Sequence, residues 1–453
     1  MSEFLGSVWW LIVSLGVLVT FHEFGHYWVA RRCGVRVLRF SIGFGRALWS
    51  RTGKDGTVYQ VAMIPLGGYV KMLDEREAPV PEAEAHEAFN RASVWKRIAI
   101  VAAGPVANLI LCVALLWAMF VIGRPDYAPV VGQVSGIAET SGLRAGDRID
   151  AVGDRETPTW MEVQLALLPA ALDHRDVALQ VTDERDRAVV RELALSSLPS
   201  DFDQRRIAAS IGLWPRHLLL PAVVGRVEEG SAAWGILAEG DRLTAIDGSP
   251  VRVFEDIGPL VQRLGDQGGT AMVEVERDGE RLALEMAPRR AELPDGRGEY
   301  WAFGIAPEAF VPPAKDAIQR YGVLASVPAA FHEVGHLTGQ LVGMIGRAFT
   351  GRVAIENTVA GPITIARAAN TYANQGVAWY LTILALLSLS LAILNLLPIP
   401  LLDGGHLLYY LIELVKGSPV SERAMVAGQY VGMALLASLM GLAFYNDILQ
   451  LVR

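Results

Sequence analysis

Four long runs without a charged residue constrain the fold of this 453-residue chain more than any other feature. A helix needs about 20 apolar residues to cross the hydrocarbon of a bilayer, so each run is long enough for one span. The third run starts with polar residues, which places its span at about 377–397. We therefore predict a polytopic α-helical membrane protein with four transmembrane helices. The runs cover residues 4–21, 98–123, 368–402 and 424–446.

Charge near the spans predicts their orientation, since Lys and Arg are enriched in cytoplasmic loops. Residues 31–97 carry 12 Lys and Arg against 7 Asp and Glu, so we expect this loop in the cytoplasm. The segment 124–367 is acidic and would lie on the opposite side with both termini. The whole chain has 40 basic and 48 acidic residues, which argues against a nucleic-acid partner. Its two cysteines exclude a disulfide-stapled scaffold.

The acidic segment contains a repeat. Apolar and polar residues alternate there in short runs, as is typical of strands, and the pattern around Gly146-Asp147 recurs 94 residues later at Gly240-Asp241. The repeat predicts two tandem copies of one α+β fold of about 90 residues. Its pattern is similar to that of PDZ domains, which implies peptide capture by strand addition. The Gly-Asp pairs themselves are expected only to form a turn between helix and strand.

A motif with catalytic potential ends the first span. His22, Glu23 and His26 form the pattern H-E-x-x-H. Residues i and i+4 share a face of a helix, so both imidazoles can reach one Zn²⁺ ion. Glu23 can then take a proton from water activated by the ion. Three ionisable groups at the edge of the hydrocarbon are costly unless they are used, so we predict a catalytic zinc centre with His22 and His26 as ligands and Glu23 as general base.

A catalytic zinc ion needs a third protein ligand. Asp403 follows the third span and lies on the same side of the membrane as His22 by the number of crossings. Pro398 and Pro400 break the helix before it, which is tolerated only next to protein or a water-filled cavity. His406 is an alternative third ligand, but we favour the Asp403 carboxylate at the helix break.

A second H-E-x-x-H pattern, His332 to His336, lies in the acidic segment. It falls in an amphipathic stretch and has no recognisable third ligand after it. We favour a surface or interface helix, with an accessory metal site as the alternative. A further hypothesis makes this motif the catalytic centre of an envelope protease.

The motifs together resemble those of the site-2 protease family over essentially the whole chain. The resemblance implies an intramembrane zinc metalloprotease that binds one catalytic Zn²⁺ ion in a bacterial inner membrane. Its substrates would be single-pass transmembrane proteins already trimmed by a site-1 protease, such as the anti-sigma-E factor RseA, and remnant signal peptides. The resemblance is carried by HEFGH at 22–26, RFSIGFG at 39–45, IPLGGYVKM at 64–72, AGPVAN at 103–108, AGPITIA at 360–366 and NLLPIPLLDGGH at 395–406.

The resemblance also implies roles for residues outside the metal centre. Residues 39–72 would form a β-structure that dips into the membrane and presents an edge to unwound substrate. The paired outer domains would exclude substrates that still carry a bulky outer domain. The competing hypothesis is a membrane-anchored PDZ peptide-binding scaffold without catalysis. The predicted substrate-binding residues are Asn395, Pro398, Pro400, Gly67, Gly68 and Tyr69.

The predicted organisation places the active site near the cytoplasmic side and the PDZ-like domains in the periplasm. In chain order, the parts are transmembrane helix 1 with the first motif (1–30), a cytoplasmic loop with re-entrant β-structure (31–97), transmembrane helix 2 (98–123), PDZ-like domain 1 (124–217), PDZ-like domain 2 (218–310), an amphipathic helical region (311–376), transmembrane helix 3 (377–402), a cytoplasmic loop (403–424) and transmembrane helix 4 (425–447).

Overall fold

A computed structural model describes the chain in two compact units. One unit contains Met1–Arg124 and Gln319–Arg453, and the other contains Pro125–Ile318. The description covers all residues except 1–2, 200–201, 203–206, 293–297, 351–359 and 453.

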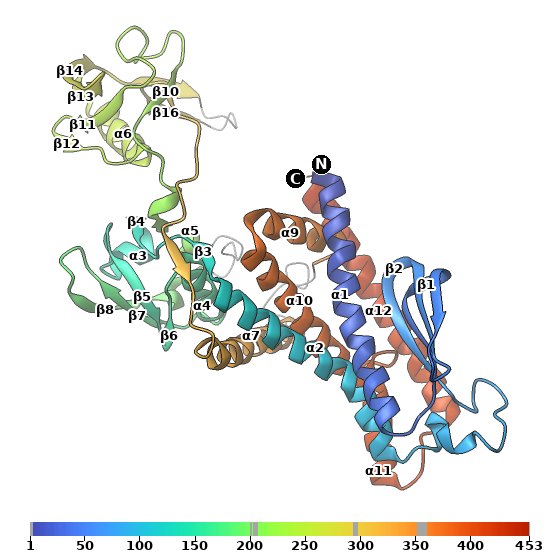
Figure 1. The fold of residues 1–453 in the computed structure, drawn as a ribbon. Helices are drawn as coiled ribbons and strands as arrows, with labels where there is room; N and C mark the ends of the chain where they lie inside the picture. The colour runs from blue at the N-terminus through green and yellow to red at the C-terminus, as the bar shows by residue number, and fades with distance from the viewer. Residues whose placement is uncertain (1–2, 200–201, 203–206, 293–297, 351–359, 453) are drawn as a thin grey trace. The chain divides into compact units, whose positions relative to one another are not determined.

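In the described part of the first unit, four helices are long and apolar enough to cross a membrane. The predicted four apolar helices are thus confirmed (Figure 1). The third begins at Val377, where Gly376 with φ of 120° separates it from the preceding helix. The four are α1 (Glu3–Arg32), α2 (Val94–Ile122), α10 (Val377–Leu396) and α12 (Glu422–Val452).

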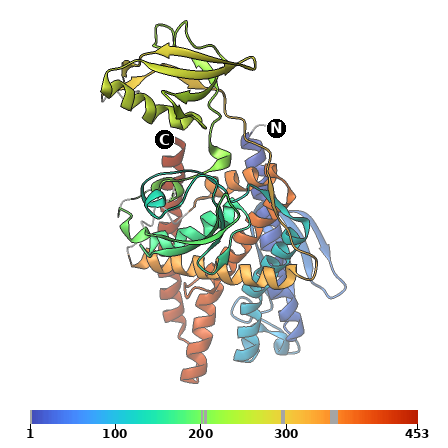
Figure 2. The same ribbon diagram turned by 90° about the vertical axis from the view of Figure 1, so that its left-hand side faces the viewer.

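Three further α-helices belong to the described part of this unit. They are α7 (Ser326–Phe349), α9 (Pro362–Gln375) and α11 (Asp403–Lys416). The second H-E-x-x-H pattern lies on α7, which runs across the direction of the spanning helices (Figure 2). Ala330 and Val334 of α7 pack in one core with Cys112 and Leu116 of α2. The amphipathic stretch therefore forms a helix whose apolar face lies against a membrane-spanning helix.

A long β-hairpin follows α1. Its strands, β1 (Val37–Thr52) and β2 (Val58–Met72), bend back on themselves. Residues 39–42 of β1 pair on one side with 58–61 and on the other with 68–71 of β2. The hairpin thereby forms a curled sheet in which 68–72 is an edge segment, since all strand partners given for it lie in β1.

The second unit contains two similar folds, one for each copy of the repeat. The sheet of the first copy has the order β6-β5-β7-β8 and that of the second has β12-β11-β13-β14. A two-stranded sheet accompanies each one, β4-β9 in the first copy and β10-β17 in the second. One longer helix also belongs to each copy, α4 (Trp160–Leu172) and α6 (Ile257–Gln267).

The strands of this unit are short. In the first copy they are β4 (Val131–Val134), β5 (Arg148–Val152), β6 (Arg155–Glu156), β7 (Val177–Thr182), β8 (Ala188–Leu193) and β9 (Leu213–Pro215), with the short helices α3 (Gly136–Thr140) and α5 (Ile207–Ser210). In the second they are β10 (Val224–Val227), β11 (Arg242–Ile246), β12 (Ser249–Pro250), β13 (Ala271–Arg277), β14 (Glu280–Met286), β15 (Arg289–Glu292), β16 (Glu299–Ala302) and β17 (Ile305–Pro307). Elsewhere, β3 (Arg124–Asp126) pairs with β18 (Ala317–Gln319).

The repeated Gly-Asp pairs make the same turn in both copies. Gly146 and Gly240 have φ of 90° and 91°, a backbone region that favours glycine. The carboxylate of Asp147 accepts a hydrogen bond from the backbone of Arg144, and that of Asp241 accepts one from Ala238. These residues therefore hold the turn before the central strand.

Candidate zinc centre

The two histidines of the first motif lie near the end of α1. His22 and His26 are four residues apart on one face of the helix, and their side chains are almost fully buried. Their Nε2 atoms are 3.2 Å apart, and their rings meet edge to face with centroids 4.8 Å apart. The helix thus directs one ring nitrogen of each histidine to the same point.

The other ring nitrogens are held by α2. Nδ1 of His26 lies 2.8 Å from the backbone oxygen of Ile100, which can only accept a hydrogen bond. Nδ1 therefore carries the hydrogen, and Nε2 keeps its lone pair. The amide nitrogen Nδ2 of Asn108 lies 3.3 Å from Nδ1 of His22, and its oxygen Oδ1 is buried without a partner. Exchange of the two amide atoms by a flip would let Oδ1 accept a hydrogen bond from Nδ1 and leave Nε2 of His22 able to bind a metal.

Glycines allow the two helices to approach this closely. A Cβ atom at Gly104 of α2 would lie 2.2 Å from Nε2 of His26 and 2.8 Å from Cε1 of His22. A Cβ atom at Gly25 of α1 would lie 2.2 Å from the backbone oxygen of Ala103. Both distances are far inside van der Waals contact, so the packing of α1 against α2 requires glycine at each position.

Asp403 comes to the histidines from the first turn of α11. Its Oδ2 atom lies 3.2 Å from Nε2 of His22 and 3.5 Å from Nε2 of His26. Leu401 just before it has φ of 89°, an uncommon conformation for a branched residue. A Cβ atom at Gly404 would lie 2.1 Å from the backbone oxygen of Leu397. The turn between α10 and α11 is therefore tight, and it aims Asp403 at α1.

These three side chains fit a zinc ion. Zinc binds nitrogen and oxygen ligands at about 2.0–2.2 Å in a tetrahedron, which puts its ligand atoms about 3.3–3.5 Å apart. The three distances here are 3.2, 3.2 and 3.5 Å. Oδ2 of Asp403 is buried without a hydrogen-bond partner, which a cation would supply. Among the residues that the structure describes, this is the only group of three that could hold a metal, and it does not include His406.

Glu23 lies next to His22 on α1 and is half-buried. The edge segment of β2 passes directly over it. A Cβ atom at Gly68 would lie 3.0 Å from Cγ of Glu23 and 2.8 Å from a methyl group of Val19. The backbone of Val70, in the same segment, lies beside the Glu23 carboxylate. The hairpin thus brings an extended backbone edge to the carboxylate of the motif.

Comparison with known proteins identifies this arrangement. The model of peptidase family M50 matches residues 10–439. The chain belongs to peptidase family M50, the site-2 proteases. A protein of Xylella fastidiosa (strain 9a5c) named as a zinc metalloprotease is 52% identical over 449 residues, which cover 99% of this chain and all of that protein. The regulator of sigma-E protease RseP of Escherichia coli (strain K12) is 42% identical over 456 aligned positions that cover both chains completely.

Membership of this family decides the class of the protein. It is a zinc metalloprotease, and with its apolar helices it is a zinc intramembrane protease. The prediction of an enzyme with a Zn²⁺ cofactor is thus confirmed.

The predicted substrate-binding residues of this M50 chain lie at several places. Gly67, Gly68 and Tyr69 are on the edge segment of β2, and Tyr69 stacks on Phe44 with ring centroids 6.3 Å apart. Asn395 is in the last turn of α10 and is half-buried. Pro398 and Pro400 are in the turn before α11. Among the described residues, no hydrogen bond or ion pair joins these three to the histidine pair, and their role stays a prediction.

Sequence reasoning missed the residues that hold the histidines. Gly104 and Asn108 both belong to the stretch AGPVAN at 103–108, which carried part of the family resemblance but received no role. The spacing of four places them on one face of α2. That spacing was the signal available in the sequence.

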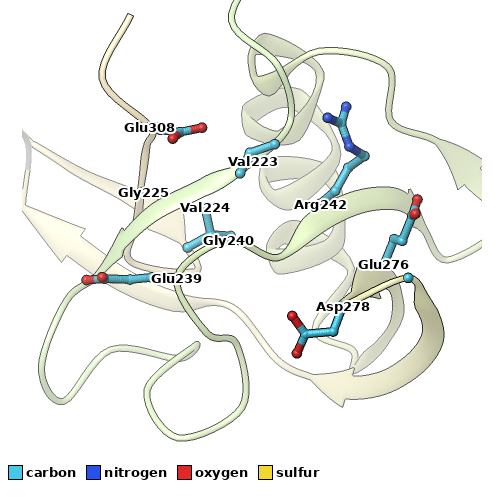
Figure 3. A pocket seen from close by; sticks show the side chains of 10 residues that line it. Val223, Val224, Gly225, Glu239, Gly240, Arg242, Glu276, Asp278 and Glu308 are labelled. Carbon is cyan, nitrogen blue, oxygen red and sulfur yellow. The ribbon is translucent and has the colours of Figure 1, made fainter.

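A separate hollow lies on the second copy of the repeat and has a volume of about 540 Å³. Its walls carry four carboxylates and one guanidinium group (Figure 3). This excess of negative charge disfavours an anionic ligand such as a peptide carboxyl terminus. The charged residues of the wall are Glu239, Glu276, Asp278, Glu308 and Arg242.

Proposed function

We propose that this protease cuts single-pass transmembrane proteins after a site-1 protease has removed their outer part. The anti-sigma-E factor RseA and remnant signal peptides are the proposed substrates, in line with the name of the RseP relative. The observation that carries the proposal is the convergence of His22, His26 and Asp403 within 4.8 Å beneath an open strand edge.

The proposed chemistry uses residues of three helices. His22 and His26 of α1 and Asp403 of α11 hold the zinc ion, while Asn108 and the backbone of Ile100 on α2 orient the two rings. Bound zinc supplies a Lewis acid that polarises water and the peptide carbonyl. Glu23 takes the proton from the attacking water and passes it to the leaving amine. The burial of the histidines keeps bulk water from competing for the ion.

Substrate presentation follows from the hairpin. A transmembrane helix hides its amide groups in hydrogen bonds and must unwind before hydrolysis. In this proposal the unwound segment pairs with residues 68–72 and lies beside Glu23. Gly67, Gly68 and Tyr69 would contact the substrate backbone, while Asn395, Pro398 and Pro400 would line the path to the metal.

The proposed placement in the cell is a bacterial inner membrane. The excess of Lys and Arg in 31–97 supports a position of the hairpin and the zinc centre near the cytoplasmic side. Both termini and the two PDZ-like domains would then lie in the periplasm. There the domains would act as a size filter against substrates that keep a bulky outer domain.

Cleavage of a trimmed single-pass substrate by the detergent-solubilised, zinc-loaded protein tests the proposal. We expect Glu23→Gln to lower the cleavage rate by about 10²–10⁴-fold, the range of general base catalysis. Glu333→Gln, in the second motif, is the matched control and should cleave at the wild-type rate. Loss of cleavage with Glu333→Gln and not with Glu23→Gln would refute the assignment.

The size filter has its own comparison. The same transmembrane substrate is offered with and without its folded outer domain. We expect faster cleavage of the trimmed form by the full-length protein. Equal rates for the two forms would exclude a filtering role for the outer domains.

A further inference from the structure

The second histidine pair, on α7, lies outside the catalytic group. His332 and His336 are four residues apart on one helix, and their rings meet edge to face at 81° with centroids 5.1 Å apart. The corresponding values for His22 and His26 are 82° and 4.8 Å. The pair on α7 therefore has nearly the same mutual geometry as the pair that we assign to zinc.

The position on the helix makes this pair accessible. Ala330 and Val334 are buried in the core with α2. At 3.6 residues per turn, each histidine lies about 200° round the helix from the core residue two positions before it. His332 is exposed and His336 is half-buried. An ion can therefore reach the pair from outside the protein core.

The rest of the second motif does not build a catalytic site. Glu333 is half-buried on α7, next to the core residue Val334. No third histidine, cysteine or carboxylate completes a metal-binding group with the pair in the described part of the chain. A catalytic zinc ion needs a third protein ligand, so this geometry speaks against a second protease centre and leaves two imidazoles as the candidate ligands.

We propose that His332 and His336 form a second, open binding site for a late first-row divalent metal ion such as Zn²⁺. Imidazole nitrogen suits zinc, copper and nickel, and two histidines at i and i+4 can chelate one ion. Each ring has two nitrogens, so one can bind the ion while the other keeps a further contact. The remaining coordination positions are open to water or to a donor from another molecule. This inference does not depend on the proposed substrates.

Zinc stoichiometry of the full-length protein in detergent tests the site. In equilibrium dialysis against Zn²⁺, the wild type should bind one ion tightly at the catalytic group and one more weakly on α7. His332→Ala and His336→Ala should each lose the weaker equivalent and keep the tight one. Glu333→Gln is the matched control, because it leaves both imidazoles in place, and it should retain two ions.

The outcomes separate this site from the catalytic one. Retention of the weaker equivalent by His332→Ala would overturn the proposal, as would its loss in Glu333→Gln. His332 carries the decisive substitution because its side chain is exposed and its removal opens no core cavity. An Asp403→Ala variant should lose the tightly bound ion and keep the weakly bound ion on α7, because Asp403 belongs only to the catalytic group.

Discussion

The two H-E-x-x-H motifs of this chain share a sequence pattern and a ring geometry, yet they lie in different surroundings. The pair on α1 is buried, its outer nitrogens are held by α2, and Asp403 meets it from α11. The pair on α7 lies away from the core face of its helix, with His332 exposed and His336 half-buried. The comparison teaches that the motif supplies two ligands and a carboxylate, whereas the packing of other helices supplies the third ligand and the orientation of the rings.

Removal of the third ligand should leave the histidine pair on α1 with two protein ligands for zinc, as in the pair on α7. We expect Asp403→Ala to reduce proteolysis to background, a loss of at least 10³-fold, and to release zinc on dialysis, because two histidines alone bind zinc weakly. Metal analysis after dialysis and the substrate cleavage assay measure both effects. Glu77→Gln removes a carboxylate on the exposed loop and should change neither. Zinc retention by Asp403→Ala would show that another residue is the third ligand.

The glycine before the second histidine occurs in both motifs, at Gly25 and Gly335. A Cβ atom at Gly25 would collide with the backbone of α2, whereas one at Gly335 would meet no atom within 4 Å. We expect Gly25→Ala to cost about 1–3 kcal/mol of stability through overpacking. Gly335→Ala should be neutral or stabilise by up to about 1 kcal/mol, because alanine favours a helix.

The two glycine variants are heated in detergent, and the residual proteolytic activity after each temperature gives their melting temperatures. Equal melting temperatures for Gly25→Ala and Gly335→Ala would contradict the close contact between α1 and α2.

Asn108 orients the ring of His22 in the histidine pair on α1. Its side chain contacts Nδ1 of His22, and its backbone oxygen accepts a hydrogen bond from Ser388. We expect Asn108→Ala to lower zinc affinity by about 10–100-fold, the usual effect of losing a partner of a metal-binding histidine. Zinc-chelator competition gives the affinity. Asn90→Ala, which loses a contact to Glu75 in the loop, is the control, and an equal effect there would indicate nonspecific destabilisation.

The smallest expected effect concerns the helix that carries Asp403. Glu413 of α11 makes two hydrogen bonds with Arg97 of α2, at 2.7 and 3.2 Å. We expect Glu413→Gln to lower cleavage about 2–10-fold, since it weakens the pair without removing a ligand. The initial rate at saturating zinc measures the effect. A loss as large as that of Asp403→Ala would mean that Glu413 acts at the metal itself.

The parts of the site and fold that could be predicted depend on the spacing of residues along the sequence. The i, i+4 relation places His22 and His26 together within one helix, and the number of membrane crossings puts Asp403 on their side. The four apolar helices follow from the length of their uncharged runs. The contacts of Gly104 and Asn108 could not be derived in this way, because they depend on how α2 is rotated against α1. The internal spacing of the two motifs is the same, and the sequence distinguished them only by the third-ligand pattern that the second motif lacks. In the structure, burial, the contacts of α2 and Asp403 distinguish them.

The curled hairpin has a consequence for how this protease would choose its cleavage site. The edge segment 68–72 pairs with residues 39–42, which are held on their other side by 58–61, so the position of the edge in the sheet is fixed. A substrate strand that pairs with this edge turns alternate side chains to opposite faces. Preferences around the scissile bond should therefore recur at every second position, and a shift of one residue should exchange favoured for disfavoured side chains. The hairpin would thus set the register of the substrate and select the size and shape of its side chains at alternate positions.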